Sequence, residues 1–139
     1  RCAATPALAP TAPATMARVL LAEDDGFQRA MIGMLLEGTA LMEAHNGLEA
    51  LAALLAPSPT PPHLALLDLD MPLLTGAEVA TLLRGVRHDR GEDAAPAVVA
   101  ALSADAAERA EALRAAGCDL CIPKPVPAQA LAEGVASAR

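Results

Sequence analysis

Aromatic residues are nearly absent from this sequence of 139 residues. Phe27 is the only phenylalanine, and the chain has no tyrosine and no tryptophan. Hydrophobic residues still make up 54% of the chain, so a core would have to consist of leucine, valine, alanine and methionine. This composition is typical of parallel α/β proteins, in which buried apolar strands lie between alanine-rich helices. The length is that of one domain and suffices to bury most of its apolar surface.

Other scarcities exclude whole classes of protein. The three cysteines, Cys2, Cys118 and Cys121, are too few and too unevenly spaced for a secreted disulfide framework. No apolar run approaches the about 20 residues that a membrane helix needs. The net charge is −7, and no predicted face carries a cluster of lysine or arginine, which argues against direct binding to nucleic acid or to anionic membranes. We therefore expect a cytoplasmic domain that contacts neither.

The first 15 residues, RCAATPALAPTAPAT, differ in composition from the rest of the chain. They alternate alanine, proline and threonine and contain no continuous apolar region of the kind that signal peptides have. This composition predicts an extended or disordered leader or linker over residues 1–15 and a folded domain over 16–139. The chain begins at Arg1, and Met16 opens the first strand-like segment. A linker from a longer protein and a misplaced start are both open.

Beyond Met16, short apolar runs alternate with segments of helical periodicity. The expected strands cover residues 18–22, 40–44, 64–68, 97–102 and 119–122. The expected helices cover residues 26–38, 46–56, 76–86, 105–117 and 127–138, and the polar stretch 87–96 is expected to be a solvated loop. Five strands connected in this way require a parallel sheet with right-handed crossovers and helices on both faces.

Apolar stripes at helical spacing are expected to face the core of this fold. In the first three helices they are Phe27, Ala30, Met31, Met34 and Leu35; then Leu48, Leu51 and Leu55; then Val79, Leu82, Leu83 and Val86.

Polar and charged residues collect where the expected strands end. They are Glu23, Asp24 and Asp25 after the first strand, Asp68 and Asp70 at the third, Ser103 at the fourth and Lys124 at the fifth. Ligands of such sheets bind beyond the carboxyl ends of the strands. Asp68 and Asp70 would lie on the same side of an extended segment, where their like charges require a cation or a donor between them.

Clustered carboxylates at an open edge suit Mg²⁺, and a lysine with a hydroxyl suits a phosphoryl group. The pattern indicates a carboxylate that accepts a phosphoryl group with the help of Mg²⁺.

The segments VLLAEDD, LLDLDMPLLTG, VVAALSA and PKPV, in this order and spacing, resemble the receiver domain of two-component response regulators over residues 16–139. The resemblance implies a flavodoxin-like, doubly wound α/β fold with strand order 2-1-3-4-5. It also implies a Mg²⁺-dependent conformational switch that a histidine kinase or a histidine phosphotransfer protein phosphorylates. Such a domain is not an enzyme with a separate substrate. A stand-alone regulator and the receiver of a hybrid histidine kinase are both open.

The resemblance assigns roles to individual residues. Asp68 is the phosphoacceptor. Mg²⁺ would be held directly by Asp24, through water by Glu23, and by Asp68 and the backbone carbonyl of Asp70.

On the phosphoryl side, Ser103 is the switch hydroxyl, with Ala104 beside it, and Lys124 is the phosphoryl-binding ammonium, joined to Pro125 by a cis peptide. Cys121 occupies the position where the family carries a switch tyrosine or phenylalanine, and a thiol is too small for that role.

Several alternatives compete with these assignments. Ser103 could also be the N-cap of the fourth helix, a role that is compatible with that of the switch hydroxyl. The segment CDLC (118–121) has the C-x-x-C spacing of redox or zinc sites, but it does not open a helix and no further Cys or His offers zinc ligands, so Cys118 is expected to pack as a small hydrophobe. A haloacid-dehalogenase-like phosphatase would use the D-x-D motif at Asp68, but Met71 and Pro72 break its pattern. A pseudo-receiver that is not phosphorylated is the third alternative.

Overall fold

The computed structural model describes residues 16–91 and 95–139, and the prediction of a leader over residues 1–15 lies outside this part of the chain. The described residues form the strands β1 (Arg18–Ala22), β2 (Ala40–Ala44), β3 (Leu64–Asp68), β4 (Val98–Ser103) and β5 (Leu120–Pro123). The helices are α2 (Gly26–Leu35), α3 (Gly47–Leu55), α4 (Gly76–Arg90), α5 (Ala106–Ala116) and α6 (Ala128–Ala138).

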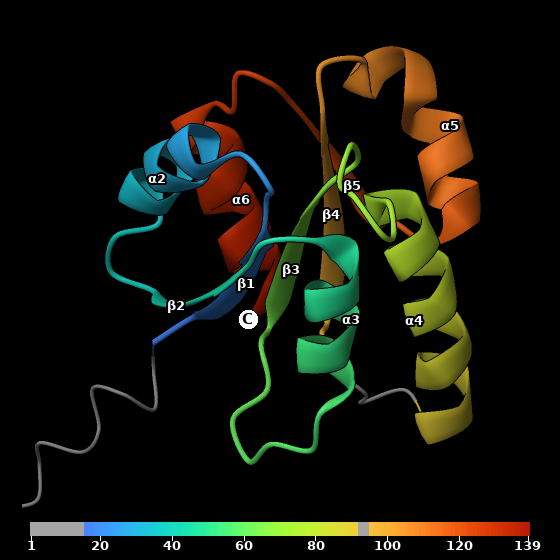
Figure 1. The fold of residues 1–139 in the computed structure, drawn as a ribbon. Coiled ribbons are helices and arrows are strands. Elements are labelled where there is room, and N and C mark those ends of the chain that lie inside the picture. The colour runs from blue at the N-terminus through green and yellow to red at the C-terminus, as the bar shows by residue number, and fades with distance from the viewer. Residues whose placement is uncertain (1–15, 92–94) are drawn as a thin grey trace, which may run out of the picture.

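All strands are parallel and follow the order β2-β1-β3-β4-β5, so the predicted flavodoxin-like topology is confirmed. Helices α2 and α6 cover one face of the sheet, and α3, α4 and α5 cover the other (Figure 1). The central strand β3 is buried along its whole length, as its uninterrupted apolar sequence predicts for a strand covered on both faces. Its last residue is Asp68, so the core leads directly to a carboxylate at the carboxyl edge.

The apolar stripes expected in the helices were partly wrong. In α2 the helix buries Ile32, with Leu36 just beyond its end, whereas Phe27, Met31, Met34 and Leu35 are exposed. In α3 the expected Leu48 is exposed and Leu54 is buried instead. In α4 the expected burial of Val79 and Leu83 is confirmed, whereas Leu82 is exposed. Helical periodicity identifies an apolar stripe on a helix. The way the helix packs on the sheet decides which residues in or beside that stripe are buried.

Two helix boundaries also differ from the prediction. Helix α4 begins with a capping box, in which Thr75 and Glu78 accept each other's backbone N–H groups, and it continues to Arg90 through residues that we expected to be loop. The basic residues of its last turn favour this extension because they interact well with the negative end of the helix dipole. Helix α2 instead stops at Leu35, ahead of the positive φ of Gly38. Within the described residues, none of the helices combines the length and the hydropathy needed for a membrane span.

Candidate phosphoacceptor site

Three carboxylates meet at the carboxyl edge of the sheet. Glu23 follows β1, Asp24 is the next residue, and Asp68 ends the neighbouring strand β3. Each of them offers an oxygen that lies within 4.8 Å of the others. Glu23 and Asp68 are buried while Asp24 is exposed, so the cluster opens to solvent on one side. Carboxylate oxygens at such a spacing, with room for water, fit a hard divalent cation.

Lys124 bridges the two buried carboxylates. Its Nζ donates to Asp68 Oδ1 at 2.7 Å and to Glu23 Oε1 at 3.0 Å. The ammonium reaches the cluster because Lys124 directly follows β5 and its backbone N–H donates to the Ser103 carbonyl at 3.0 Å. The peptide bond between Lys124 and Pro125 is cis.

The charges of this cluster are unbalanced. Burial raises the pKa of the Glu23 carboxyl to about 7, and the neighbouring Asp68 adds to this effect. Burial would lower the pKa of Lys124, but its hydrogen bonds to Asp68 and Glu23 outweigh that effect and raise it. One ammonium therefore faces two buried carboxylates, with Asp24 as a third beside them. A bound cation would restore the balance.

Ser103 and Ala104 lie at the end of the adjacent strand β4. Ser103 is buried, and its Oγ accepts the backbone N–H of Asp105 at 3.1 Å. Asp105 itself is the N-cap of α5, so the alternative of Ser103 as that cap was wrong, although its hydroxyl does bind the chain just before the helix. Ala104 is exposed beside it.

Two further acids that the sequence placed at this edge do not join the cluster. The Asp25 side chain caps α2 and accepts the N–H groups of Phe27 at 2.9 Å and Gln28 at 3.1 Å. The side chain of Asp70 is exposed, and β3 ends two residues earlier at Asp68. Among the described residues, the group of carboxylates that could hold a metal ion includes Asp68 and does not include the Asp70 side chain. The role of the Asp70 carbonyl stays a prediction.

Arg29, a residue that the motifs of the sequence do not identify, also belongs to the surroundings of the site. Its Nη1 donates to the backbone carbonyl of Glu23 at 2.8 Å, and its Nε lies 3.6 Å from Glu43 Oε1 on β2. In the sequence Arg29 is only marked by its spacing of six residues from Glu23. This spacing does not predict a contact, because the position of Glu43 beside Arg29 depends on the pairing of β2 with β1.

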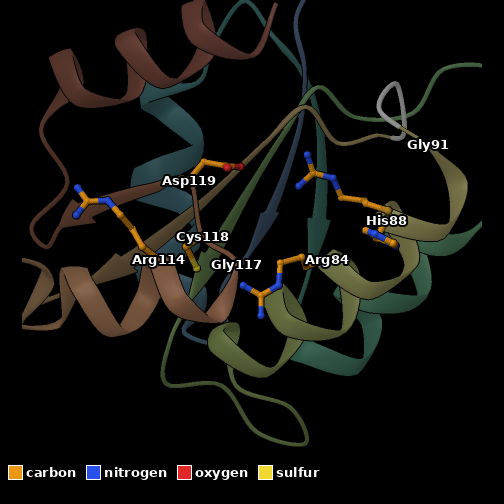
Figure 2. Close-up of a pocket in the computed structure, with 8 residues that line it drawn as sticks. Arg84, His88, Gly91, Arg114, Gly117, Cys118 and Asp119 are labelled. Carbon is orange, nitrogen blue, oxygen red and sulfur yellow. The ribbon is translucent and has the colours of Figure 1, made fainter.

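The two cysteines of the CDLC segment do not form a reactive site. Cys118 is buried at the edge of a cavity of about 570 Å³, together with Arg84, Arg114 and Asp119 (Figure 2). Burial raises its pKa to about 11, which keeps the thiol protonated. Cys121 is half-buried and packs against the part of the core on the face of the sheet that α3, α4 and α5 cover. Among the described residues, the carboxylates Glu23, Asp24 and Asp68 form the one group that could hold a metal ion.

An apolar hollow of about 830 Å³ adjoins the acidic cluster. It is lined mainly by apolar residues of α2, and from the segments after β4 and β5 by Ala104, Lys124, Pro125 and Val126. Lys124 thus belongs to both the cluster and the hollow, which makes the exposed face of α2 continuous with the site.

The family of the chain follows from comparison with known proteins. The family model for the response regulator receiver domain matches residues 19–136. The chain belongs to this family, whose members are signalling modules of two-component systems. No curated protein sequence matches the chain.

Several solved structures share this fold. Full-length ShkA, solved in complex with AMPPNP, is 36% identical with a TM-score of 0.69; the match covers 88% of this chain and 24% of ShkA. The receiver domain of Saccharomyces cerevisiae Ssk1, crystallised with the histidine phosphotransfer protein Ypd1, is 26% identical with a TM-score of 0.74, over 89% of this chain and 92% of that one.

The receiver domain of the sensor histidine kinase PA1611 from Pseudomonas aeruginosa was solved with magnesium coordinated in its active site cleft. It is 21% identical with a TM-score of 0.71, over 88% of this chain and 97% of that one, and it supports the fold alone.

Proposed function

We propose that this domain is a phosphorylation-driven switch that accepts a phosphoryl group on Asp68 from a phosphohistidine of a histidine kinase or a histidine phosphotransfer protein. The observation that carries this proposal is the convergence of Asp68, Glu23, Asp24 and Lys124 at one edge of the sheet. The apolar hollow beside Lys124 supports a protein donor, because it offers a partner helix an apolar surface next to the phosphoacceptor.

The transfer requires that a carboxylate oxygen of Asp68 attacks the phosphorus while its bond to the histidine nitrogen breaks. The electron pair of that bond stays on the imidazole, and Asp68 becomes an acyl phosphate. Lys124 neutralises the charge on the phosphoryl oxygens, and the Ser103 hydroxyl donates a hydrogen bond to them. Glu23, Asp24, Asp68 and the Asp70 carbonyl would hold Mg²⁺, which supplies further charge neutralisation when bound.

The switch follows from the position of Ser103 and Lys124. Ser103 ends β4 and Lys124 directly follows β5, and these strands lead into the loops before α5 and α6. When both side chains turn toward a phosphoryl group, these loops shift, and phosphorylation biases a two-state equilibrium. We place this switch in the cytoplasm, where two-component phosphotransfer proteins act.

Phosphorylation by a small phosphodonor tests the proposal directly. Incubation of the chain with acetyl phosphate and Mg²⁺ is expected to add one phosphoryl group, detected as a mass increase in intact-protein mass spectrometry. Asp68→Asn is expected to abolish the increase, because the amide nitrogen and oxygen are poor nucleophiles. Asp119→Asn, at the other edge of the sheet, is the matched control and keeps the reaction.

Two outcomes separate the alternatives. Equal labelling of Asp68→Asn and the wild type would refute the assignment of Asp68. A wild-type chain that stays unlabelled while it still binds a phosphodonor protein would identify a pseudo-receiver.

A further inference from the structure

Arg29 contacts the acidic pair through the backbone. Its Nη1 donates to the Glu23 carbonyl oxygen at 2.8 Å, while Nε lies 3.6 Å from the Glu43 carboxylate on β2. The side chain is only 18% exposed, so this link is largely shielded from water. We propose that Arg29 is a positioning residue that holds the Glu23–Asp24 peptide in the orientation required for Mg²⁺ binding. This inference rests on the proposed function.

The contact acts on Asp24 because of the atom that it fixes. The Glu23 carbonyl belongs to the peptide bond that leads into Asp24, so a hydrogen bond to this oxygen fixes the plane from which the Asp24 side chain departs. The chain before it is anchored by the Glu23 N–H, which donates to the Ala44 carbonyl at 3.1 Å. The chain after it is anchored by the Asp25 cap of α2. Asp24 is the exposed residue between these two anchors. The hydrogen bond from Arg29 holds the peptide bond that joins Glu23 to Asp24.

The positive charge of Arg29 and its hydrogen bond to Glu23 have opposite effects on the affinity of the site for Mg²⁺. A second positive charge near the cluster disfavours a bound cation, so loss of the charge alone would tighten Mg²⁺ binding. Loss of the link would instead let the Asp24 peptide rotate and weaken binding. Loss of a group that hydrogen-bonds to a metal ligand and orients it typically costs 10–100-fold in metal affinity. The sign of the change therefore distinguishes positioning from a merely electrostatic role.

Titration calorimetry with Mg²⁺ tests the inference. Arg29→Gln is expected to raise the Kd for Mg²⁺ by roughly tenfold. Arg29→Lys is expected to raise it too, because one ammonium cannot serve both the Glu23 carbonyl and Glu43 as the planar guanidinium does. Arg114→Gln is the matched control: it removes the same charge from an exposed residue near the end of α5, beside the cavity of Figure 2, and is expected to leave the Kd within twofold.

A kinetic measurement adds a readout that a loss of stability would not produce. When the rate of phosphorylation by acetyl phosphate is followed against Mg²⁺ concentration, Arg29→Gln is expected to shift the half-maximal concentration upward by about the same factor as the Kd. The rate at saturating Mg²⁺ is expected to stay within twofold of the wild type. Should Arg29→Gln fail to fold, Arg29→Lys carries both measurements.

Two results would overturn the inference while leaving the proposed function intact. One is Mg²⁺ binding by Arg29→Gln that is as tight as in the wild type or tighter. The other is wild-type affinity in Arg29→Lys, which would reduce the role of Arg29 to its charge. If the wild type itself neither binds Mg²⁺ nor accepts a phosphoryl group, the proposed function fails and this inference fails with it.

Discussion

Cys121 lies on β5 three residues before Lys124, at the position where the resemblance to receiver domains predicts a switch aromatic. Its side chain is half-buried against the α3–α5 side of the core, and burial raises its pKa. A thiol has too little volume to alternate between a buried and an exposed position as a ring does. Coupling between Asp68 and the surface is therefore expected to run through the backbone of the loop after Ser103.

Cys121→Ala tests this interpretation. We expect phosphorylation and the affinity of the phosphorylated chain for its partner protein to stay nearly unchanged, because there is no ring movement to lose. The measurement is the dissociation constant of the phosphorylated wild type and of the phosphorylated variant for the same partner. A tenfold loss, about 1.4 kcal/mol, would show that the thiol itself carries the signal.

His63 has a structural role at the opposite edge of the sheet. Its Nδ1 accepts the backbone N–H of Arg18 at 3.0 Å, and its own N–H donates to the Arg18 carbonyl at 2.8 Å, so the residue joins the beginnings of β1 and β3. Burial lowers the pKa of His63, and the charges of Arg18 and Arg139 act in the same direction.

This shift predicts a pH dependence of stability. The folded chain binds a proton at His63 more weakly than the unfolded chain does, so stability is complete above the ordinary histidine pKa of about 6.5 and decreases as the pH falls below it. The raised pKa of Glu23 acts in the opposite direction. The measurement is therefore the difference in urea unfolding between the wild type and His63→Gln. A difference that stays constant between pH 8 and pH 5 would contradict this role.

At the scale of the element, a small residue decides how closely α3 approaches the loop that follows Asp68. Gly47 begins α3, and a Cβ at this position would overlap the backbone carbonyl of Leu74, in the loop between β3 and α4. That loop connects Asp68 to α4, so close packing of α3 holds it in place.

Gly47→Ala is expected to destabilise the chain by about 1–3 kcal/mol, because α3 and the loop must move apart. Gly85→Ala is the matched control: it lies in α4 with nothing within 4 Å of the added Cβ. There alanine favours the helix and is expected to stabilise by about 0.5–1 kcal/mol. Urea unfolding measures both changes. Equal effects of the two substitutions would show that the contact with Leu74 imposes no constraint.

At the scale of the whole molecule, negative charge is concentrated at one edge of the sheet. Glu23, Asp24 and Asp68 repel one another there, and Lys124 compensates only part of that repulsion. The core holds these groups close together, so the repulsion lowers the stability of the fold without a cation.

Mg²⁺ is therefore expected to raise the Tm. A cation that binds only the folded chain stabilises it by about 1.4 kcal/mol at ten times its Kd, which corresponds to roughly 3–5 °C for a domain of this size. Differential scanning fluorimetry at millimolar MgCl₂ measures the shift. It is expected to shrink in Asp24→Asn and to persist in the control Asp89→Asn on α4. An equal shift in both variants would place the binding elsewhere.

The sequence by itself determined the sheet and the composition of the site edge. Short apolar runs such as 64–67, in alternation with helical segments, favour strands buried on both faces, and a parallel sheet brings their carboxyl ends to one edge. Asp68, Glu23 and Lys124 can therefore be grouped from the sequence alone. These residues are far apart in the chain, but the alternation of strands and helices already determines that all parallel strands end at the same edge of the sheet.

The tertiary structure alone decided which face of each helix is buried and which long side chains meet. Phe27 and Met31 belong to an apolar stripe by periodicity, yet α2 crosses the sheet so that Ile32 faces inward. Arg29 acquires its position only because β2 pairs with β1 and carries Glu43 to within 3.6 Å of it. Periodicity is a property of one segment, whereas the rotation of a helix and the partners of a flexible side chain depend on neighbours distant in sequence.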